Sequence, residues 1–267
     1  MNGFWPDGRP AAVSLSFDDG MGSHLTTAVP ELEARDLRGT FYVPAGGSED
    51  DPSEPRSWRE RLEPFAVAAA AGHEIGNHTV LHPCSLNIDT EAEWDRRGIN
   101  LLNWTLDDIA ADLAEAQRRI AAVVSDRGSA SFAYPCYEST VGKGRDRVSF
   151  VPLVADMFVA GRARGGVFGG FGNDPLACDL HYLSSFAAER MPGPLMIGLV
   201  ERTLARGRWS IFTFHGIAEG DLAVGLADFQ ELLDHLTARQ EEIWTAPVAD
   251  VASYAAAKAG EPSKQDA

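Results

Sequence analysis

Apolar and polar residues alternate near the start of the chain, where the segment 13–17 places serines between large apolar side chains. This period-2 pattern predicts a strand, and Gly20 supplies the turn that ends it. Two carboxylates, Asp18 and Asp19, stand exactly between strand and turn. Adjacent carboxylates at the end of a buried strand are costly unless a positive charge lies beside them. The pattern therefore predicts either a metal site or, alternatively, a loop whose carboxylates cap the following helix.

The same reading extends along the whole chain. Alternating or short apolar runs predict further strands at 39–43, 73–77, 130–134, 181–185 and 209–214. Helical spacing predicts helices at 23–36, with Ser23 as its cap, and at 61–71, 106–124, 194–206, 226–237 and 248–257. The segment 150–158 suits either helix or strand, and 138–147 is expected to be a loop.

Strand and helix alternate throughout, and this order predicts a parallel sheet in an α/β protein. No shift of composition marks a boundary, so we expect one domain over residues 1–267, with a core at about 12–258 and a frayed tail at 259–267. Unusual polar residues fall just past several predicted strands. In a closed parallel barrel those strand ends share one face, where catalytic groups collect.

A histidine pair, His78 and His82, follows the strand predicted at 73–77. A spacing of four puts both imidazoles on one face if the backbone makes a single turn, and Pro83 disfavours a longer helix. Neutral imidazoles at a strand end suit zinc or a similar ion. The alternative is two loop histidines that are satisfied independently.

Charge narrows the choice of partner. The formal net charge of −16 excludes nucleic acid and anionic membranes as expected partners, because Lys and Arg make phosphate contacts. No apolar run approaches membrane-spanning length. Residues 1–7 lack the basic and apolar segments of a secretory signal, so we expect a cytoplasmic protein, although a trimmed chain would look the same.

Three cysteines, Cys84, Cys136 and Cys178, are widely spaced and odd in number. This pattern favours free thiols in a reducing compartment over a disulfide framework. No two cysteines stand two residues apart, so a thiolate zinc site is not expected.

Taken together, the motifs resemble those of the polysaccharide deacetylases of the NodB-homology type, carbohydrate esterase family four. The matching stretches are Ser-Phe-Asp-Asp-Gly at 16–20, His-Thr-Val-Leu-His at 78–82 and Phe-Ala-Tyr-Pro at 132–135. His215 stands at the position of the late histidine of this family, and the likeness spans roughly residues 12–216. The resemblance implies an irregular (β/α) barrel of about seven parallel strands.

The resemblance also implies a divalent metal bound by Asp19, His78 and His82. Zinc is the expected ion, with Co²⁺, Ni²⁺ or Mn²⁺ as alternatives. Such an ion polarises an acetyl carbonyl and lowers the pKa of a bound water.

Catalytic roles follow from the same resemblance. Asp18 would be the base, His215 the acid that protonates the departing amine, and the backbone N–H of Cys136 a donor to the oxyanion. The implied reaction is N-deacetylation of an acetylated amino sugar or oligosaccharide.

One departure from the family pattern concerns the base. The third motif of the family usually begins with an arginine that tethers the base aspartate, and Ala133 stands there. We hypothesise that Arg162 supplies this charge to Asp18, with Arg164 as the weaker candidate.

A second departure concerns the acid. The Asp-and-Trp motif that orients the family's catalytic histidine is not evident, and Asp174 and Asp179 are only weak candidates for orienting His215.

Other activities remain open on the same barrel. These are removal of O-acetyl groups from xylan, hydrolysis of a cyclic ureide or imide, and carbohydrate binding by a catalytically silent site. The sugar, linkage, chain length and oligomeric state are not specified by the sequence.

Overall fold

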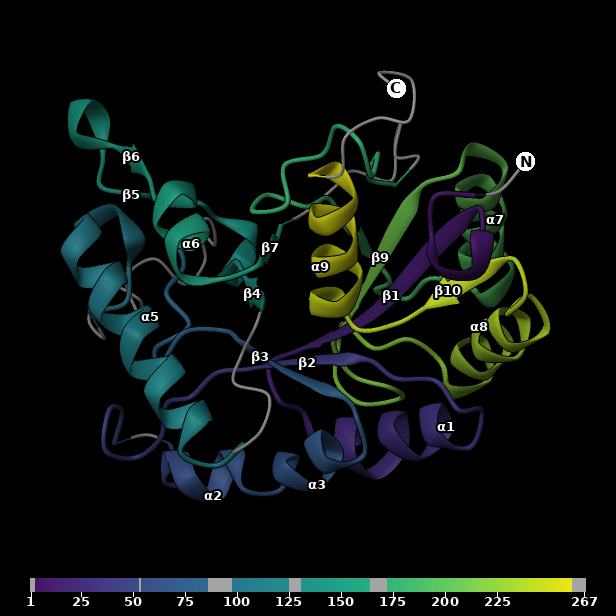
Figure 1. Cartoon of the computed structure of the whole chain (residues 1–267). Coiled ribbons are helices and arrows are strands. Elements are labelled where there is room, and N and C mark those ends of the chain that lie inside the picture. Colours follow the sequence, from purple (N-terminus) through teal and green to yellow (C-terminus); the bar gives the residue numbers. More distant parts are fainter. Residues whose placement is uncertain (1–2, 53, 86–97, 125–130, 164–171, 261–267) are drawn as a thin grey trace.

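The computed structural model describes residues 3–52, 54–85, 98–124, 131–163 and 172–260. Within these residues, a single curled sheet runs through the molecule and helices cover its outer face (Figure 1). The tail expected at 259–267 lies, from residue 261 on, outside the described residues.

Seven strands of this sheet lie in the order β7-β4-β3-β2-β1-β9-β8, and β10 pairs with the first residues of β1. Every pairing in the sheet is parallel, so the predicted fold class is confirmed. The strands are β1 (Ala11–Asp18), β2 (Thr40–Val43), β3 (Glu74–Asn77), β4 (Ser131–Ala133), β7 (Ala160–Arg162), β8 (Phe186–Ala187), β9 (Trp209–Phe214) and β10 (Ile243–Thr245).

The segment before β8 closes the curl of the sheet. The backbone N–H of Leu183 donates to Gly161 of β7 over 2.8 Å, and its carbonyl accepts from Ala163 over 2.8 Å. A few residues later, the N–H of Ala188 donates to Thr213 of β9 over 2.8 Å. One short stretch of chain thus bridges the two ends of the sheet, and the result is an irregular barrel.

The two faces of β1 show why the sequence alternates. Its large apolar side chains, with Phe17 fully buried, pack against the outer helices in one cluster that includes Leu32, Leu199 and Leu233. Its small and polar side chains point into the barrel, where Ser14 Oγ accepts from the indole of Trp209 over 3.0 Å. Small inward residues leave room inside the barrel for the charged groups described below.

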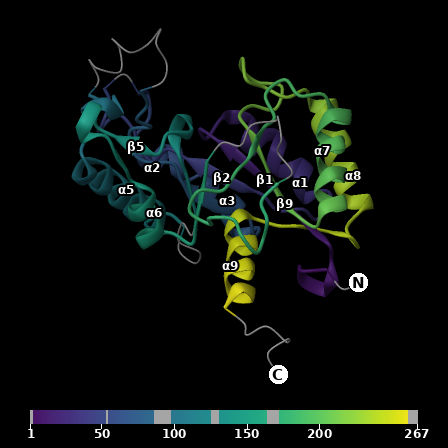
Figure 2. The ribbon, with the colours of Figure 1, turned by 90° about the horizontal axis from the view of Figure 1, so that it is seen from above.

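The helices flank the sheet on three sides (Figures 1 and 2). They are α1 (Val29–Glu33), α2 (Trp58–Leu62), α3 (Phe65–Ala70), α5 (Leu106–Ala121), α6 (Val151–Met157), α7 (Gly193–Arg206), α8 (Leu226–Ala238) and α9 (Val248–Ala259). Thr105 and Asp108 form a capping box at the start of α5, the helix predicted at 106–124. Gly207 ends α7 in the left-handed region, φ 64°.

Three local expectations were wrong. The helix predicted at 23–36 is a π-helical turn, His24–Ala28, followed by the short α1, and the Ser23 side chain does not cap it. The helix predicted at 61–71 is two helices, α2 and α3, separated around Pro64, which has no N–H to donate. The loop predicted at 138–147 contains part of a hairpin, β5 (Thr140–Val141) with β6 (Val148–Ser149).

Helix α9 closes the amino-terminal end of the barrel. Its first amides point at two residues that begin strands: Val248 N–H donates to Thr40 Oγ1 over 2.9 Å, and Ala249 N–H donates to Glu74 Oε2 over 3.0 Å. Burial raises the pKa of the Glu74 carboxyl, while the hydrogen bond from Ser131 Oγ, 2.6 Å long, acts in the opposite sense. A carboxylate at a helix N-terminus is stabilising. Helix α9 therefore covers this end of the barrel, and the candidate site lies at the opposite end.

Helices long and apolar enough to cross a membrane do not occur in the part of the chain that the structure describes.

Candidate active site

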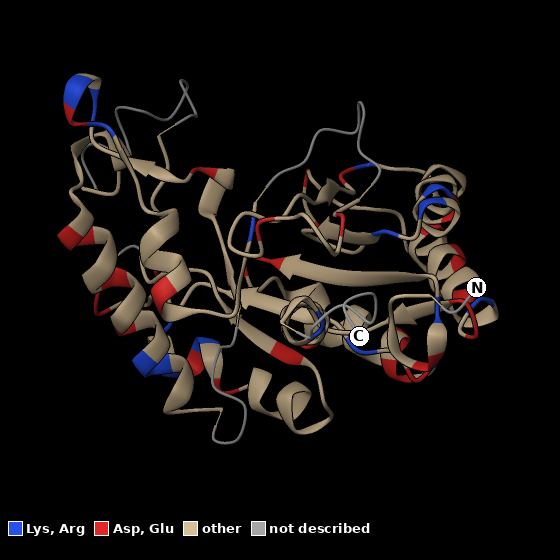
Figure 3. Cartoon of the chain, turned by 45° about the horizontal axis from the view of Figure 1, so that its top comes forward, with Lys and Arg blue, Asp and Glu red and all other residues tan. Residues whose placement is uncertain are grey.

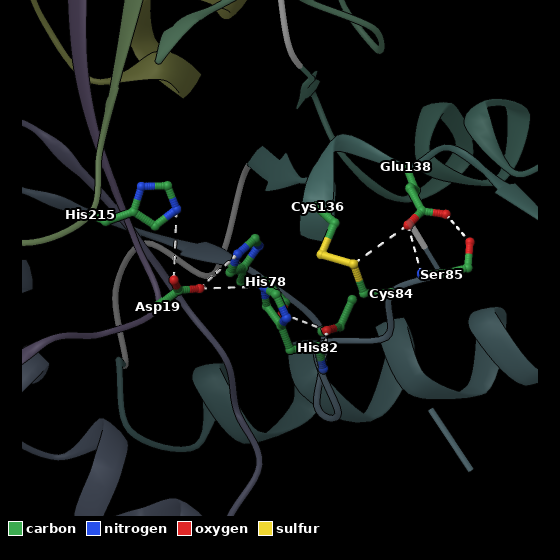
Figure 4. Close-up of a disulfide and its surroundings, with 9 residues drawn as sticks. Asp19, His78, His82, Cys84, Ser85, Cys136, Glu138 and His215 are labelled. Carbon is green, nitrogen blue, oxygen red and sulfur yellow. Dashed lines mark hydrogen bonds and ion pairs between the residues drawn. A yellow bond between two sulfur atoms is a disulfide. The ribbon is translucent and has the colours of Figure 1, made fainter. Parts of the chain in front are cut away.

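The candidate site lies where the strands end. Asp19 follows β1, and its carboxylate Oδ1 lies 3.4 Å from Nε2 of His78 and 3.3 Å from Nε2 of His82 (Figure 4). Asp19 has a left-handed backbone, φ 76°, and its N–H donates to the carbonyl of Tyr42 over 3.1 Å. This conformation turns the Asp19 side chain out of the strand toward the histidines.

His78 is almost completely buried, 1 % exposed, and its orientation is fixed from behind. Its Nδ1 lies 2.9 Å from the carbonyl oxygen of Ala133. Because a carbonyl only accepts, Nδ1 carries a proton, and Nε2 is the ring nitrogen that faces Asp19: it donates to the carboxylate when it is protonated and is the ligand atom for a metal when it is not. A backbone carbonyl behind a ligating imidazole is the arrangement common to metal-binding histidines.

The turn from His78 to His82 is held by a carboxylate that sequence reasoning missed. Asp112 of α5 accepts from the N–H of Val80 over 2.7 Å and from the N–H of Leu81 over 3.2 Å. Within the turn, Thr79 Oγ1 accepts from the N–H of His82 over 2.9 Å. The turn is as tight as the spacing predicts, and it brings His82 back beside His78.

Electrostatics within the cluster favour an ionised Asp19. Burial alone would raise the pKa of the Asp19 carboxyl. Hydrogen bonds and positive charge from His78 and His82 outweigh burial and hold this pKa well below its ordinary value. One anionic oxygen and two imidazole nitrogens, all within 4.8 Å of one another, therefore meet at one point.

These three residues fit a divalent metal such as zinc. Tetrahedral zinc with ligand bonds of about 2.0–2.2 Å holds its ligand atoms roughly 3.4 Å apart. The distances from Asp19 Oδ1 to the two histidine nitrogens, 3.4 and 3.3 Å, match that spacing. A donor set of one carboxylate and two imidazoles is typical of zinc and its neighbours in the first transition row.

The neighbouring carboxylate, Asp18, points into the barrel and meets a buried arginine. Arg162 of β7 is fully buried, and its Nη2 donates to Asp18 Oδ1 over 2.5 Å and also to Oδ2. The rings of Tyr42 and Tyr137 lie 5.2 and 5.4 Å from the guanidinium carbon of Arg162. Burial by itself would lower the pKa of Arg162, but the charge of Asp18 raises it, so the guanidinium stays charged.

His215, directly after β9, completes the cluster from the far side. Its Nε2 lies 3.8 Å from Asp19 Oδ2, and its Nδ1 lies 3.9 Å from Oε1 of Glu189. Its carbonyl oxygen accepts from Nε2 of the buried His24 over 2.7 Å. Burial lowers the pKa of His24, so that imidazole is neutral and acts as a donor only through Nε2.

The comparisons with known proteins agree with this geometry. The family model described as polysaccharide deacetylase matches residues 6–142, just over half of the chain. The chain belongs to the polysaccharide deacetylase family. No curated protein matches the chain.

Solved structures resemble this deacetylase chain in fold. A candidate polysaccharide deacetylase from Mycobacterium smegmatis is 18 % identical over 97 % of this chain and 94 % of its own, with a TM-score of 0.61. A deacetylase solved with its substrate is 15 % identical over 91 % of both chains, with a TM-score of 0.51. A family 4 acetyl xylan esterase from Clostridium thermocellum is 17 % identical over 91 % of this chain and 90 % of its own, with a TM-score of 0.49.

Against the pattern of the deacetylase family, the arginine partner of Asp18 comes from another strand. Ala133 occupies the family position on β4, and Arg162 stands directly beside it on β7, because these two residues pair across the sheet. The hypothesis placed Arg162 at Asp18, and the two are in contact there. Arg164 lies outside the described residues.

The expected candidates for orienting His215 are elsewhere. Asp174 pairs with Arg208, and Asp179 lies 3.8 Å from Nδ1 of His181. Glu189, which faces His215, was missed. The available signal was its place just beyond the strand predicted at 181–185, where the other site residues of this barrel also stand after strands.

The expectation of three free thiols was wrong. Cys84 and Cys136 form a disulfide, with their Cα atoms 5.9 Å apart, and only Cys178 of the described cysteines is free. The two residues are 52 positions apart in sequence. They meet because β3 and β4 are neighbours and each cysteine lies a few residues beyond its strand.

Cys136 lies in the 3₁₀ turn Pro135–Tyr137, beside the metal-ligand cluster (Figure 4). Its backbone is left-handed, φ 49°, and its N–H lies in the first turn, where no acceptor within the turn is available. The Cys136 N–H therefore has no helical acceptor within its own turn.

A pocket of about 280 Å³ adjoins Asp19 and His82. Acidic residues dominate its polar lining, in keeping with the many acidic positions spread over the molecule (Figure 3). Two of the lining carboxylates are paired with arginines, Glu54 with Arg61 and Asp50 with Arg119. Paired carboxylates of this kind accept hydrogen bonds from hydroxyl groups, the groups that a sugar presents.

Proposed function

We propose that this protein is a metal-dependent deacetylase that removes N-acetyl groups from an amino sugar or oligosaccharide. One observation carries the proposal: Asp19, His78 and His82 converge within hydrogen-bonding distances, and Asp18 lies next to them against a buried arginine. Membership of the polysaccharide deacetylase family supports the same reaction.

Asp19, His78 and His82 would hold the metal. A divalent ion bound there would polarise the acetyl carbonyl and lower the pKa of a water molecule beside it. Asp18 is the base in this proposal, because its carboxylate lies next to the cluster and is kept in place by Arg162. Its partner is a permanently charged group, so Asp18 can take a proton from water without drifting from its position.

Cys136 and His215, on different sides of the cluster, would act on the intermediate and on the leaving group (Figure 4). The N–H of Cys136 would donate to the oxygen of the tetrahedral intermediate, since the turn that carries it faces the cluster. His215 would protonate the amine as it departs, with the Glu189 carboxylate 3.9 Å from its Nδ1. An amine leaves poorly unless it is protonated, so this acid matters more for an amide than for an ester.

The test begins with the metal. Protein purified without added metal should contain about one equivalent of a divalent ion by elemental analysis. Acetate release is then measured on N-acetylglucosamine oligomers, with acetylated xylan and an allantoin-like ureide assayed in parallel.

Each outcome separates the candidate functions. Acetate from the amino-sugar oligomers supports the proposal. Activity on acetylated xylan alone makes the protein an O-acetyl esterase, and ring opening of the ureide alone makes it a hydrolase of cyclic amides. Sugar binding without turnover on any of these compounds, in metal-loaded protein, identifies a silent carbohydrate-binding site and overturns the proposal.

A further inference from the structure

The disulfide joins the loop that follows the metal-ligand candidate His82 to the turn that carries the proposed oxyanion donor (Figure 4). Cys84 lies two residues after the metal-ligand candidate His82. Cys136 provides the proposed oxyanion donor through its own amide. One covalent bond therefore limits the distance between the loop after His82 and the turn that carries Cys136.

Both loops hold conformations that need external restraint. His82, Cys136 and Tyr137 have left-handed backbones, with φ of 48°, 49° and 61°. Side chains other than glycine adopt this region at a cost, and they persist there only where surrounding contacts determine the conformation. The disulfide is one such contact, placed directly between the two loops.

A second connection joins the same loops without a covalent bond. The Glu138 carboxylate accepts from the N–H of Ser85 over 2.7 Å and from the Ser85 hydroxyl. The backbone of Cys84 is held separately, since its N–H donates to the carbonyl of Ile99 over 3.1 Å. Opening the disulfide would thus loosen the two loops without detaching them.

The two sulfur atoms differ in access. Cys84 is 1 % exposed, whereas Cys136 is partly exposed. An incoming thiolate reaches Cys136 more easily, and the sulfur of Cys84 lies 3.5 Å from Oε1 of Glu138, which is placed to accept a hydrogen bond from the thiol that forms.

We propose that the Cys84–Cys136 disulfide is a thiol–disulfide exchange site that controls the geometry of the active site. A dithiol reductant attacks Cys136, so that a mixed disulfide forms and the Cys84–Cys136 bond breaks. The second sulfur of the reductant then displaces Cys136. The reductant becomes a disulfide and loses two electrons, and its two protons end on Cys84 and Cys136.

The expected consequence rests on the proposed function. Reduction releases the restraint on the Cys136 turn, so kcat should fall while KM stays the same. Complete loss of an oxyanion donor lowers kcat by about 10²–10³, and a displaced donor should cost roughly tenfold. Metal affinity should also fall roughly tenfold, as it does when groups behind metal ligands are disturbed.

The experiment starts with a thiol count in denaturant. Oxidised protein should show one reactive thiol, Cys178, and protein treated with a phosphine reductant that is then removed should show three. Kinetics on N-acetylglucosamine oligomers compare these two states. The double variant Cys84→Ser/Cys136→Ser should match the reduced protein and ignore the reductant, whereas Cys178→Ser should behave as the unchanged chain in both states.

A second measurement does not depend on turnover. Co²⁺ affinity of the metal-stripped oxidised protein and of the double serine variant is measured by equilibrium dialysis, and the variant should bind Co²⁺ roughly tenfold more weakly. Three thiols in protein that was never reduced, or a double variant with the Co²⁺ affinity and kcat of the oxidised protein, would overturn the proposal. If no substrate is turned over, the proposed function fails on its own, and the Co²⁺ comparison still decides the role of the disulfide.

Discussion

The two parts of the chain contribute to the site in different ways. The part that matches the family, residues 6–142, supplies the metal-ligand candidates from two short motifs. The part that follows supplies Arg162, Glu189 and His215 from three separate strand ends. Metal ligands are fixed by a short local motif, because a turn of five residues presents both histidines. Partners of the proposed base and acid need only reach the right point in space, so neighbouring strands can supply them.

The largest expected effect is that of replacing Asp18 in the family-matched part. It distinguishes the proposed base from the metal-ligand candidates beside it. Asp18→Asn removes the proton acceptor but leaves the metal site intact, so kcat should fall by about 10²–10⁴ with metal content unchanged. His82→Ala is the matched control, since it should lose both metal and activity. If Asp18→Asn also lost its metal, Asp18 and Asp19 would not have the different roles proposed for them.

The next effect tests the link between the two parts. Arg162→Met leaves Asp18 buried without a partner, which should lower the free energy of unfolding by about 3–5 kcal/mol and reduce kcat. Denaturant unfolding and acetate release measure the two changes.

A double variant separates stability from activity in the same pair. Asp18→Asn/Arg162→Met removes the unpaired charge, so it should recover most of the stability but none of the activity. If Arg162→Met alone has the free energy of unfolding and the kcat of the unchanged chain, Arg162 does not hold Asp18 in place.

A smaller effect concerns a histidine in the family-matched part that lies away from the site. Burial lowers the pKa of His73 from 6.5 to about 4, and its Nδ1 accepts from the N–H of Gly39 over 3.0 Å. Between these pH values the unfolded chain binds more protons than the folded one. Stability should therefore fall as the pH drops from 6.5 to 4, by up to about 3 kcal/mol.

His73→Asn tests this pH dependence, since its side-chain oxygen can take the place of Nδ1. Unfolding at several pH values should show a flatter curve for the variant, with kcat at neutral pH unchanged. If the free energy of unfolding of the variant depends on pH as it does in the unchanged chain, the proton is taken up by another group.

The smallest effect lies in the part beyond the family match. Glu189→Gln keeps the size of the side chain but removes the charge facing Nδ1 of His215, and kcat should fall about tenfold, as expected for a partner that orients a catalytic group. KM should not change. Asp174→Asn and Asp179→Asn are the controls, because both carboxylates lie elsewhere, and an equal loss in either would argue against a special role for Glu189.

The features that the sequence predicted correctly depend on a local pattern of residues. The strand that leads to Asp18, the turn from His78 to His82 and the capped helix α5 all follow from period, spacing and turn residues within a few positions. Arg162 follows from the resemblance, because Ala133 stands where the family has the arginine that tethers the base.

Features that depend on distant contacts were not predictable. Cys84 and Cys136 were expected to be free because their number and spacing carry no trace of the pairing of β3 with β4. Ser23 has the sequence of a helix cap, but its hydroxyl accepts from the N–H of Ile217 over 3.1 Å, so a tertiary contact replaces the local one. Asp112 has no sequence signal beyond that of an ordinary helix residue. Its role depends on the N–H groups at 80–81, which only the folded chain brings to it.

The place of β10 has a consequence for how the protein is made. This strand, Ile243–Thr245, pairs with the first strand of the sheet, and α9 then seals the barrel through Thr40 and Glu74. These two elements are synthesised more than two hundred residues after β1. The paired edge of β1 and the Glu74 carboxyl therefore remain uncovered on the nascent chain until β10 and α9 emerge, and chaperones can bind there during that interval.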